Sequence, residues 1–221
     1  MKNWNLFAVG AVVAFLVAGS TNSWGATVFD DPGNELADPT ITASQTAHSS
    51  SYAVDNIFDN DVSGAGNDAG HGYATGTPTN AAADAFVEFD FGTATDIGGF
   101  VFYQRGNNND TVLSFNLIFD DTSDFSSPLS TLTFDTTGTP DFALQGDNAV
   151  SGVPDRQEFE FSSNITARYV KWDVSSSDSV FDGATEMEFW SSSVVPEPSS
   201  IVLTVISCLC LGLGVKRRTR R

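Results

Sequence analysis

Hydrophobic and polar residues alternate along much of the chain between residues 41 and 190. In residues 86–91, Val87, Phe89 and Phe91 fall on one face while Glu88 and Asp90 fall on the other. Successive side chains of a strand point to opposite sides of a sheet, so this pattern predicts a half-buried strand. Further strands are predicted at residues 113–119, 129–134, 159–161, 170–174 and 187–190.

Residues 100–103 differ from these runs because they are apolar on both faces, which predicts a central strand. Clusters of Gly, Asn, Asp, Ser and Pro separate the strands, and no segment has the 3.6-residue period of an amphipathic helix. Short strands with such connections predict an all-β jelly-roll β-sandwich. The 18 phenylalanines suit the space between two sheets. Residues 60–83 contain few apolar residues and are predicted to form a surface loop.

The first 40 residues are predicted to lie outside the sandwich. Lys2 precedes an apolar stretch and then small residues, the layout of a secretory signal peptide, which we assign to residues 1–25. Small residues near positions 18–20 and 23–25 both allow cleavage, and we favour a mature start near Ala26. Residues 26–40 are acidic and interrupted by prolines, so they are predicted to be a lead-in without regular structure, followed by the β-sandwich at residues 41–191.

The last residues have three parts that differ in composition. After a linker at residues 192–195 come Pro196, Glu197 and Pro198, an apolar run at residues 201–215, and a basic end. The apolar run predicts a transmembrane segment with the cations on the cytoplasmic side. Residues 196–221 closely resemble the PEP-CTERM sorting signal of Gram-negative bacteria that make exopolysaccharide. That resemblance implies export by signal peptidase, transient membrane anchoring, processing by an exosortase, and a final place on the cell surface or in the extracellular matrix.

Charge excludes one class of partner. With both ends removed, only four cations remain against 27 carboxylates, a formal charge of about −23. Such a surface repels phosphate backbones, so nucleic acid is excluded as a partner. Both cysteines, Cys208 and Cys210, lie in the apolar tail, which leaves the exported domain without disulfides.

Six short segments, taken in order, resemble the discoidin, or coagulation factor type C, family of galactose-binding-like domains. The most characteristic are an early loop that contains Asp59 and Asp61, a strand that ends in Arg105, a strand that begins at Ala167-Arg168-Tyr169, and a closing strand at residues 184–190. The resemblance covers roughly residues 41–190 and implies the same β-sandwich.

The resemblance also implies a structural Ca²⁺ between the early aspartate loop and the last strand, which would join the two ends of the sandwich. Calcium binds six to eight oxygen ligands from carboxylates and carbonyl groups. An alternative for the same residues is a solvated acidic turn. Carried over by position, the metal ligands are Asn56, Asp59, Asp61, Gly64, Thr185 and Glu186.

Relatives of this kind bind sugars with loop residues at one end of the sandwich, which implies an arginine, a histidine and an aromatic platform. Arg105 occupies the arginine position, His71 lies in an inserted loop, and Tyr73 or Tyr103 would be the platform. The alternatives are that Arg105 pairs with a carboxylate and that His71 is merely exposed.

The expected function is therefore binding of an extracellular glycan or exopolysaccharide, without catalysis. No nucleophile or metalloprotease motif is found, and 27 carboxylates make a glycosidase pair uninformative. The alternative is a structural matrix component with no specific sugar site.

Overall fold

The computed structural model describes residues 27–62, 72–75, 85–105, 111–137, 140–145, 156–178 and 181–192. The predicted signal peptide, the sorting motif at Pro196, Glu197 and Pro198, and the apolar run at 201–215 lie outside the described residues. Among the residues described, no helix has the length and apolar character needed to cross a bilayer.

The described chain is an all-β sandwich, as the alternation predicts. Four short 3₁₀ helices accompany the strands, at Val28–Asp30 (η1), Pro32–Asn34 (η2), Ser50–Tyr52 (η3) and Val54–Phe58 (η4). The strands are β1 Thr40–Ser44, β2 Tyr73–Ala74, β3 Phe86–Gln104, β4 Val112–Asp120, β5 Ser130–Asp135, β6 Phe142–Ala143, β7 Arg156–Ser177 and β8 Gly183–Trp190.

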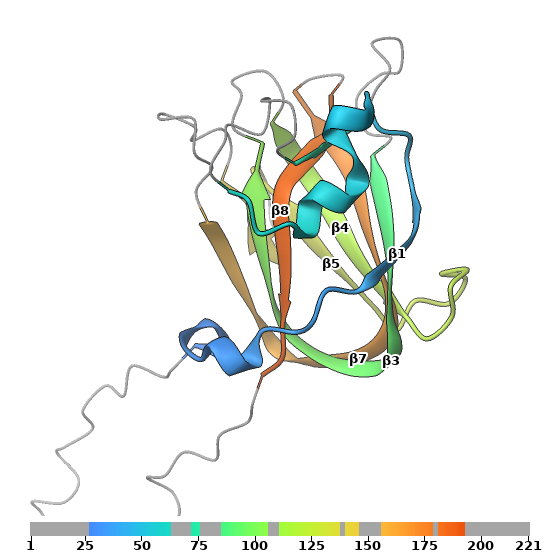
Figure 1. The fold of residues 1–221 in the computed structure, drawn as a ribbon. Helices are drawn as coiled ribbons and strands as arrows, with labels where there is room; N and C mark the ends of the chain where they lie inside the picture. Colours follow the sequence, from blue (N-terminus) through green and yellow to red (C-terminus); the bar gives the residue numbers. More distant parts are fainter. Residues whose placement is uncertain are drawn as a thin grey trace, which may run out of the picture.

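Two long strands, β3 and β7, run through both layers of the sandwich. They pair antiparallel along most of their length, with breaks in register between Asp90 and Thr95 and between Ile97 and Gly99. The first half of β3 pairs with β1, and the second half pairs with β8. The second half of β7 pairs with β4, which continues to β5 and β6. One continuous sheet therefore bends over itself, and Figure 1 shows β3 and β7 curving together at its base.

Aromatic side chains fill the space between the two layers. Phe100 contacts Phe115 and Phe134 at ring-centroid distances of 6.1 and 5.9 Å, and Phe89 meets Phe189 at 5.5 Å. All five rings are at most 2% exposed. Edge-to-face aromatic pairs contribute about 0.5–1.5 kcal/mol beyond the burial of their area. The expectation that phenylalanine fills the core is confirmed.

The predicted lead-in at residues 26–40 proves to be part of the domain where it is described. Its backbone pairs with the end of β8 through Leu36 N to Phe189 O (2.8 Å) and Ser191 N to Asn34 O (2.7 Å). Phe29 packs against Trp190 at 5.4 Å. The prolines suggested an unstructured segment, but Val28 and Phe29, which precede both prolines, pack on the outer face of β3 and β8, and Val28 is buried.

The prediction of a surface loop over residues 60–83 is wrong for β2. Tyr73 and Ala74 pair with Ala184 and Gly183 and are almost fully buried. Two residues are too few for an alternating pattern, so the strand left no signal in the sequence. The close approach of β2 to β8 depends on Gly183, because a Cβ there would lie 1.8 Å from Tyr73 O.

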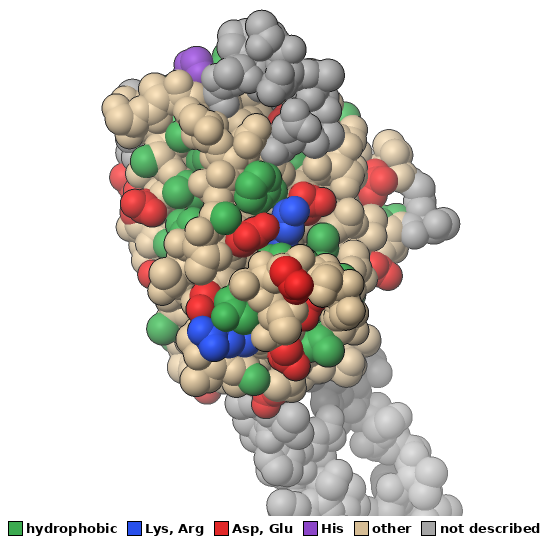
Figure 2. Space-filling view, turned by 90° about the vertical axis from the view of Figure 1, so that its right-hand side faces the viewer, with side chains coloured by type: hydrophobic (Ala, Val, Ile, Leu, Met, Phe, Trp, Pro, Cys, Tyr) green, Lys and Arg blue, Asp and Glu red, His purple; other side chains and the backbone are tan. Residues whose placement is uncertain are grey.

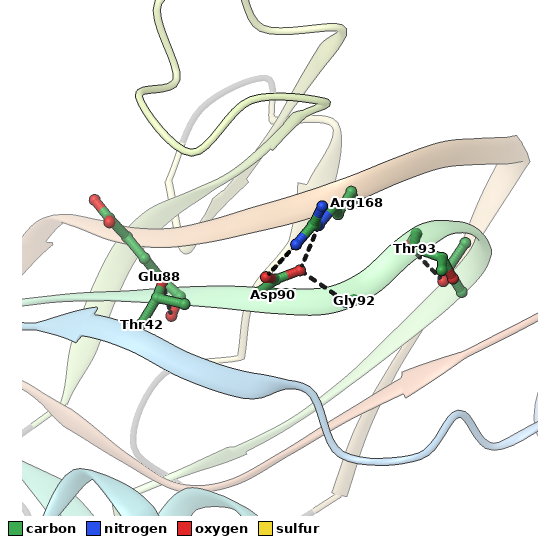
Figure 3. Close-up of polar contacts among 7 residues, drawn as sticks. Thr42, Glu88, Asp90, Gly92, Thr93 and Arg168 are labelled. Carbon is green, nitrogen blue, oxygen red and sulfur yellow. Dashed lines mark hydrogen bonds and ion pairs between the residues drawn. The ribbon is translucent and has the colours of Figure 1, made fainter.

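An ion pair links β3 and β7 on the outer surface near their bend. Arg168 donates to both carboxylate oxygens of Asp90, from Nε at 2.8 Å and from Nη2 at 2.9 Å. The same carboxylate accepts from Gly92 N at 2.7 Å, and Gly92 has a positive φ of 77° (Figure 3). The Arg168 hydrogen bond lowers the pKa of Asp90. Figure 2, which views the right-hand side of Figure 1, shows the few basic side chains on that face close to acidic ones.

Gly183→Ala is expected to destabilise the domain by about 1–3 kcal/mol, the usual cost of forcing an extra methyl group into a filled space. Gly33→Ala is the matched control, since its Cβ would meet only the Asp31 side chain, at 3.2 Å. Urea denaturation of both variants measures the difference in the free energy of unfolding. Equal stability of the two variants would contradict the close contact between β2 and β8.

Candidate functional site

Four side chains from separate segments meet at the end of β3. They are His48, which follows β1, Tyr52 in η3, Arg105 directly after β3, and Phe181 two residues before β8. We call these four residues the apical cluster. Arg105 Nη1 donates to Phe181 O at 3.1 Å, and its Cζ lies 5.4 Å from the ring centroid of Tyr52. The His48 ring lies edge-to-face on Phe181 at 4.8 Å and 5.9 Å from Tyr52.

Exposure differs sharply within the apical cluster. Arg105 is 3% exposed, His48 is exposed, and Tyr52 and Phe181 are half-buried. The guanidinium therefore lies beneath the rings, and the imidazole and the two aromatic rings form the accessible part. This arrangement offers apolar ring surface beside polar nitrogen atoms, a combination typical of sites that orient a small polar ligand.

Backbone hydrogen bonds hold the apical cluster in place. His48 N donates to Ala74 O and Thr75 N donates to Asp182 O, both at 2.8 Å, so β2 joins the segment of His48 to the segment of Phe181. Tyr52 N donates to Ser49 O at 3.0 Å within η3. The buried Gln104 side chain joins the end of β3 to the start of β4, because it donates to Val112 O and accepts from Val112 N.

The structure changes the set of residues predicted to accompany Arg105. His71 lies outside the described residues. Tyr73 is fully buried, and its hydroxyl donates to Gln45 O at 2.7 Å. Burial, with the charge of Asp182, raises the pKa of Tyr73. Its ring therefore presents no face to a ligand.

Tyr103 is not a platform either, because the N-terminal segment covers it. It is 9% exposed and packs with Val28 and Trp190 on the outer face of the β8 layer. Burial raises its pKa to about 12. Sequence reasoning chose Tyr103, near Arg105 in the chain, and Tyr73, from the loop of His71. Tyr52 and Phe181 reach Arg105 from other segments, and only the fold brings them together.

A second group of polar residues links the loop after η4 to β8. The Glu186 carboxylate is 2% exposed and accepts from Asn60 N at 3.0 Å. Burial, followed by the charge of Asp59, raises the pKa of Glu186 to about 9. Asp59 in turn accepts from Asp61 N at 2.9 Å. The structure therefore brings the Asp59 carboxylate near that of Glu186, whereas Asp61 contacts Asp59 through its backbone nitrogen.

The remaining predicted metal ligands are partly engaged in other contacts. The Asn56 amide donates to Ser51 O (3.3 Å) and Gly72 O (3.1 Å), and Thr185 Oγ1 donates to Gln104 O (3.2 Å). Gly64 lies outside the described residues. Within the described ranges, no group of three or more His, Cys, Asp or Glu side chains is placed to hold a metal. A cation here would need backbone carbonyls in addition to the two carboxylates, a mixture that calcium accepts.

Comparison with known proteins gives a family and a fold. The model of the F5/8 type C domain matches residues 40–189. No curated protein sequence matches the chain.

Solved structures with the same fold are distant in sequence. A module of a family 31 glycoside hydrolase from Clostridium perfringens, CBM32-1, is 18% identical, covers 71% of this chain and 96% of its own, and has a TM-score of 0.53. The family 32 carbohydrate-binding module of C. perfringens NanJ, solved with galactose, is 15% identical and covers 71% and 98%, with a TM-score of 0.51. The lectin domain of lectinolysin, solved with Lewis B antigen, is 17% identical and covers 70% and 94%, with a TM-score of 0.50.

Proposed function

The chain belongs to the F5/8 type C domain family through residues 40–189, and we propose that this domain binds carbohydrate at the apical cluster. The observation that carries the proposal is the exposed imidazole of His48 beside the half-buried rings of Tyr52 and Phe181, above the Arg105 guanidinium. Aromatic rings stack on the apolar face of a sugar, while ring nitrogens bond to its hydroxyls.

The relatives support carbohydrate as the ligand class. The NanJ module holds galactose and the lectinolysin domain holds Lewis B antigen. The same proposal assigns no catalytic step to the domain: it acts by binding an extracellular glycan or exopolysaccharide. The acidic surface favours a glycan without acidic groups, because like charges repel.

We also propose a structural Ca²⁺ between Asp59 and Glu186. A buried carboxylate beside a second carboxylate is costly unless a cation compensates the charge, and the raised pKa of Glu186 reflects that cost. The ion would supply this compensating charge when bound. The carboxylates of Asp59 and Glu186, with backbone carbonyls near Asn56 and Asp61, would hold it and connect the loop to β8.

Export and sorting complete the proposal. The sequence of residues 196–221 supports passage through the inner membrane, transient anchoring through 201–215 and processing by an exosortase. The absence of cysteine between residues 26 and 195 means that folding after export needs no disulfide.

For the apical cluster we expect binding to a neutral glycan on an array, with affinity about tenfold weaker in His48→Ala and Phe181→Ala. A tenfold loss corresponds to about 1.4 kcal/mol, the scale of one good hydrogen bond or ring contact. Thr46→Ala, at an exposed position two residues from His48, should bind normally. Absence of binding to every glycan would favour the alternative of a structural matrix component.

For the cation, the melting temperature in chelator should fall as the pH rises from 5 to 8.5. The pKa of Glu186 in the folded state, about 9, exceeds its ordinary value of 4.5. Between these two pH values the folded state keeps a proton that the unfolded chain releases. The contribution of Glu186 to the free energy of unfolding is therefore fully present below pH 4.5 and is lost as the pH rises toward 9.

Calcium should reverse this loss, with a rise on the order of 5 °C at pH 8 and a smaller one at pH 5. Glu186→Gln should flatten the pH dependence and abolish the calcium response, while Glu88→Gln removes the same charge elsewhere and should preserve both. A calcium response that survives in Glu186→Gln would refute the assignment.

For sorting, mass spectrometry of the cell-surface protein should give a chain that begins near Ala26 and lacks residues 201–215. In a strain without exosortase, or with Glu197→Ala, the tail should be retained in the membrane fraction. Ser199→Ala serves as the control. A surface form that retains the apolar run would contradict processing.

A further inference from the structure

A groove lies along one side of the sandwich, where the edges of the two layers face each other. One wall comes from β5 and the β6 segment, through Ser130, Leu132, Asp141 and Phe142, and the other from the middle of β7, residues 160–165. Its volume is about 380 Å³. Small-molecule sites typically have volumes of about 300–1,000 Å³, so the groove is large enough to receive a ligand.

The groove is distinct from the apical cluster and shares no residue with it. Ile165, at its end, pairs with Ile97 near the bend of β3 and β7. Arg105 follows the opposite end of β3, eight residues further along. At about 3.3 Å per residue, Ile97 and Arg105 are roughly 25 Å apart along the strand.

An apolar floor runs through the groove. Leu132, Phe142, Phe161 and Ile165 line it, and Phe142 and Ile165 are half-buried rather than enclosed. The Phe142 ring stacks on the buried Phe134 at 4.9 Å with an interplanar angle of 20°. Its position is therefore fixed by the core, and a fixed aromatic ring loses little conformational entropy when a ligand packs on it.

Polar groups without protein partners surround this floor. Within the part of the chain that the structure describes, no hydrogen bond or ion pair engages the Glu160 carboxylate or the hydroxyls of Ser130, Ser162 and Ser163. Asp141 accepts from Thr133 N through Oδ2 at 2.8 Å, which orients the carboxylate and leaves its second oxygen to a ligand. Two residues with carboxylates and three with hydroxyls thus line the same groove as the apolar strip.

The charge of the groove selects among ligands. Among the described residues that line it, Asp141 and Glu160 carry charge, and none is a lysine or arginine. Carboxylates accept hydrogen bonds from hydroxyl or amino groups and repel other carboxylates and sulfates. A ligand that fits has an apolar face for Phe142, several donors for the carboxylates, and no acidic group. Sugar rings with only hydroxyl or amino substituents have all three properties.

We propose that this lateral groove is a second carbohydrate site, which takes a sugar unit that carries no acidic group. The sugar packs its C–H face on Phe142, and its hydroxyl or amino groups donate to Asp141 and Glu160. This inference does not depend on binding at the apical cluster, because the residues of the two sites are separate.

The test is a two-dimensional ¹H–¹⁵N NMR titration of the full chain in detergent micelles, because amide shifts report each site separately. The probes are tetramers of glucose, galactose and glucosamine, with tetragalacturonate as the acidic comparator. We expect the amides of Ser130, Phe142 and Glu160 to shift with at least one of the first three probes. The acidic comparator should bind at least tenfold more weakly.

Two adjacent substitutions separate binding in the groove from effects on folding. Ser130→Phe fills the groove and should abolish these shifts, whereas Thr131→Phe, next in β5 and outside the groove lining, should preserve them. Unchanged amide shifts elsewhere in the spectrum establish that both variants are folded. Glu160→Gln should weaken binding several-fold.

Shifts at His48 and Phe181 without shifts in the groove would overturn this inference and leave the proposed function of the apical cluster intact. Shifts in the groove that persist in Ser130→Phe, or that appear equally with tetragalacturonate, would also overturn it. Shifts in the groove alone would support the lateral site while counting against the apical one.

Discussion

The antiparallel pairing of β3 with β7 is the constraint on which the rest of this structure depends. The two strands pair on both sides of the bend and so belong to both layers. β1, β4 and β8 pair directly with one of them, and β2, β5 and β6 are attached through those strands. The bend brings Phe89 and Phe100, both on β3, into opposite layers of one core. The Asp90–Arg168 ion pair and the positive φ of Gly92 lie where the pairing is interrupted. The same continuity sets where the ends of β3 lie, and thereby where Arg105 lies.

The two candidate binding places use this frame differently. At the apical cluster, the buried guanidinium of Arg105 supports rings that come from two connections, β1–β2 and β7–β8, so its shape depends on loops. The lateral groove depends on strands, since β5 and β7 supply most of its lining and Phe142 is fixed on Phe134. Sites on strands are held more rigidly than sites on loops. Substitutions in the loops would therefore leave ligand contacts in the groove unchanged, whereas they would alter ligand contacts at the apical cluster.

Sequence patterns were sufficient for the strands that alternate over four or more residues, and for Asp59 with Glu186, which a family resemblance related across 127 positions. They failed where too few residues carry the signal. β2 has two residues, and the N-terminal segment is held by backbone bonds to Phe189 and Asn34 that no side chain reveals. The prediction of which residues accompany Arg105 failed for another reason. No sequence motif marks His48, Tyr52 and Phe181. They lie close together only because β2 and the residue after it pair with both of their segments. Tyr73, which was predicted to be a platform, is a buried residue of β2 that pairs with Ala184 and donates a hydrogen bond to Gln45 O.

The position of the chain ends bears on how such a domain would work if its tail anchors it to a membrane. Asn34 O accepts from both the backbone N and the hydroxyl of Ser191, so the beginning and the end of the described domain lie side by side. Figure 1 shows them at the end of the sandwich opposite η3 and η4. The apical cluster lies with η3, and it would therefore face away from an anchoring bilayer. The groove lies along the side of the sandwich and would be accessible in either the anchored or the released form. A domain with binding groups at its tip and on its flank could contact two segments of one polymer, and two linked weak contacts hold a polymer more firmly than either alone.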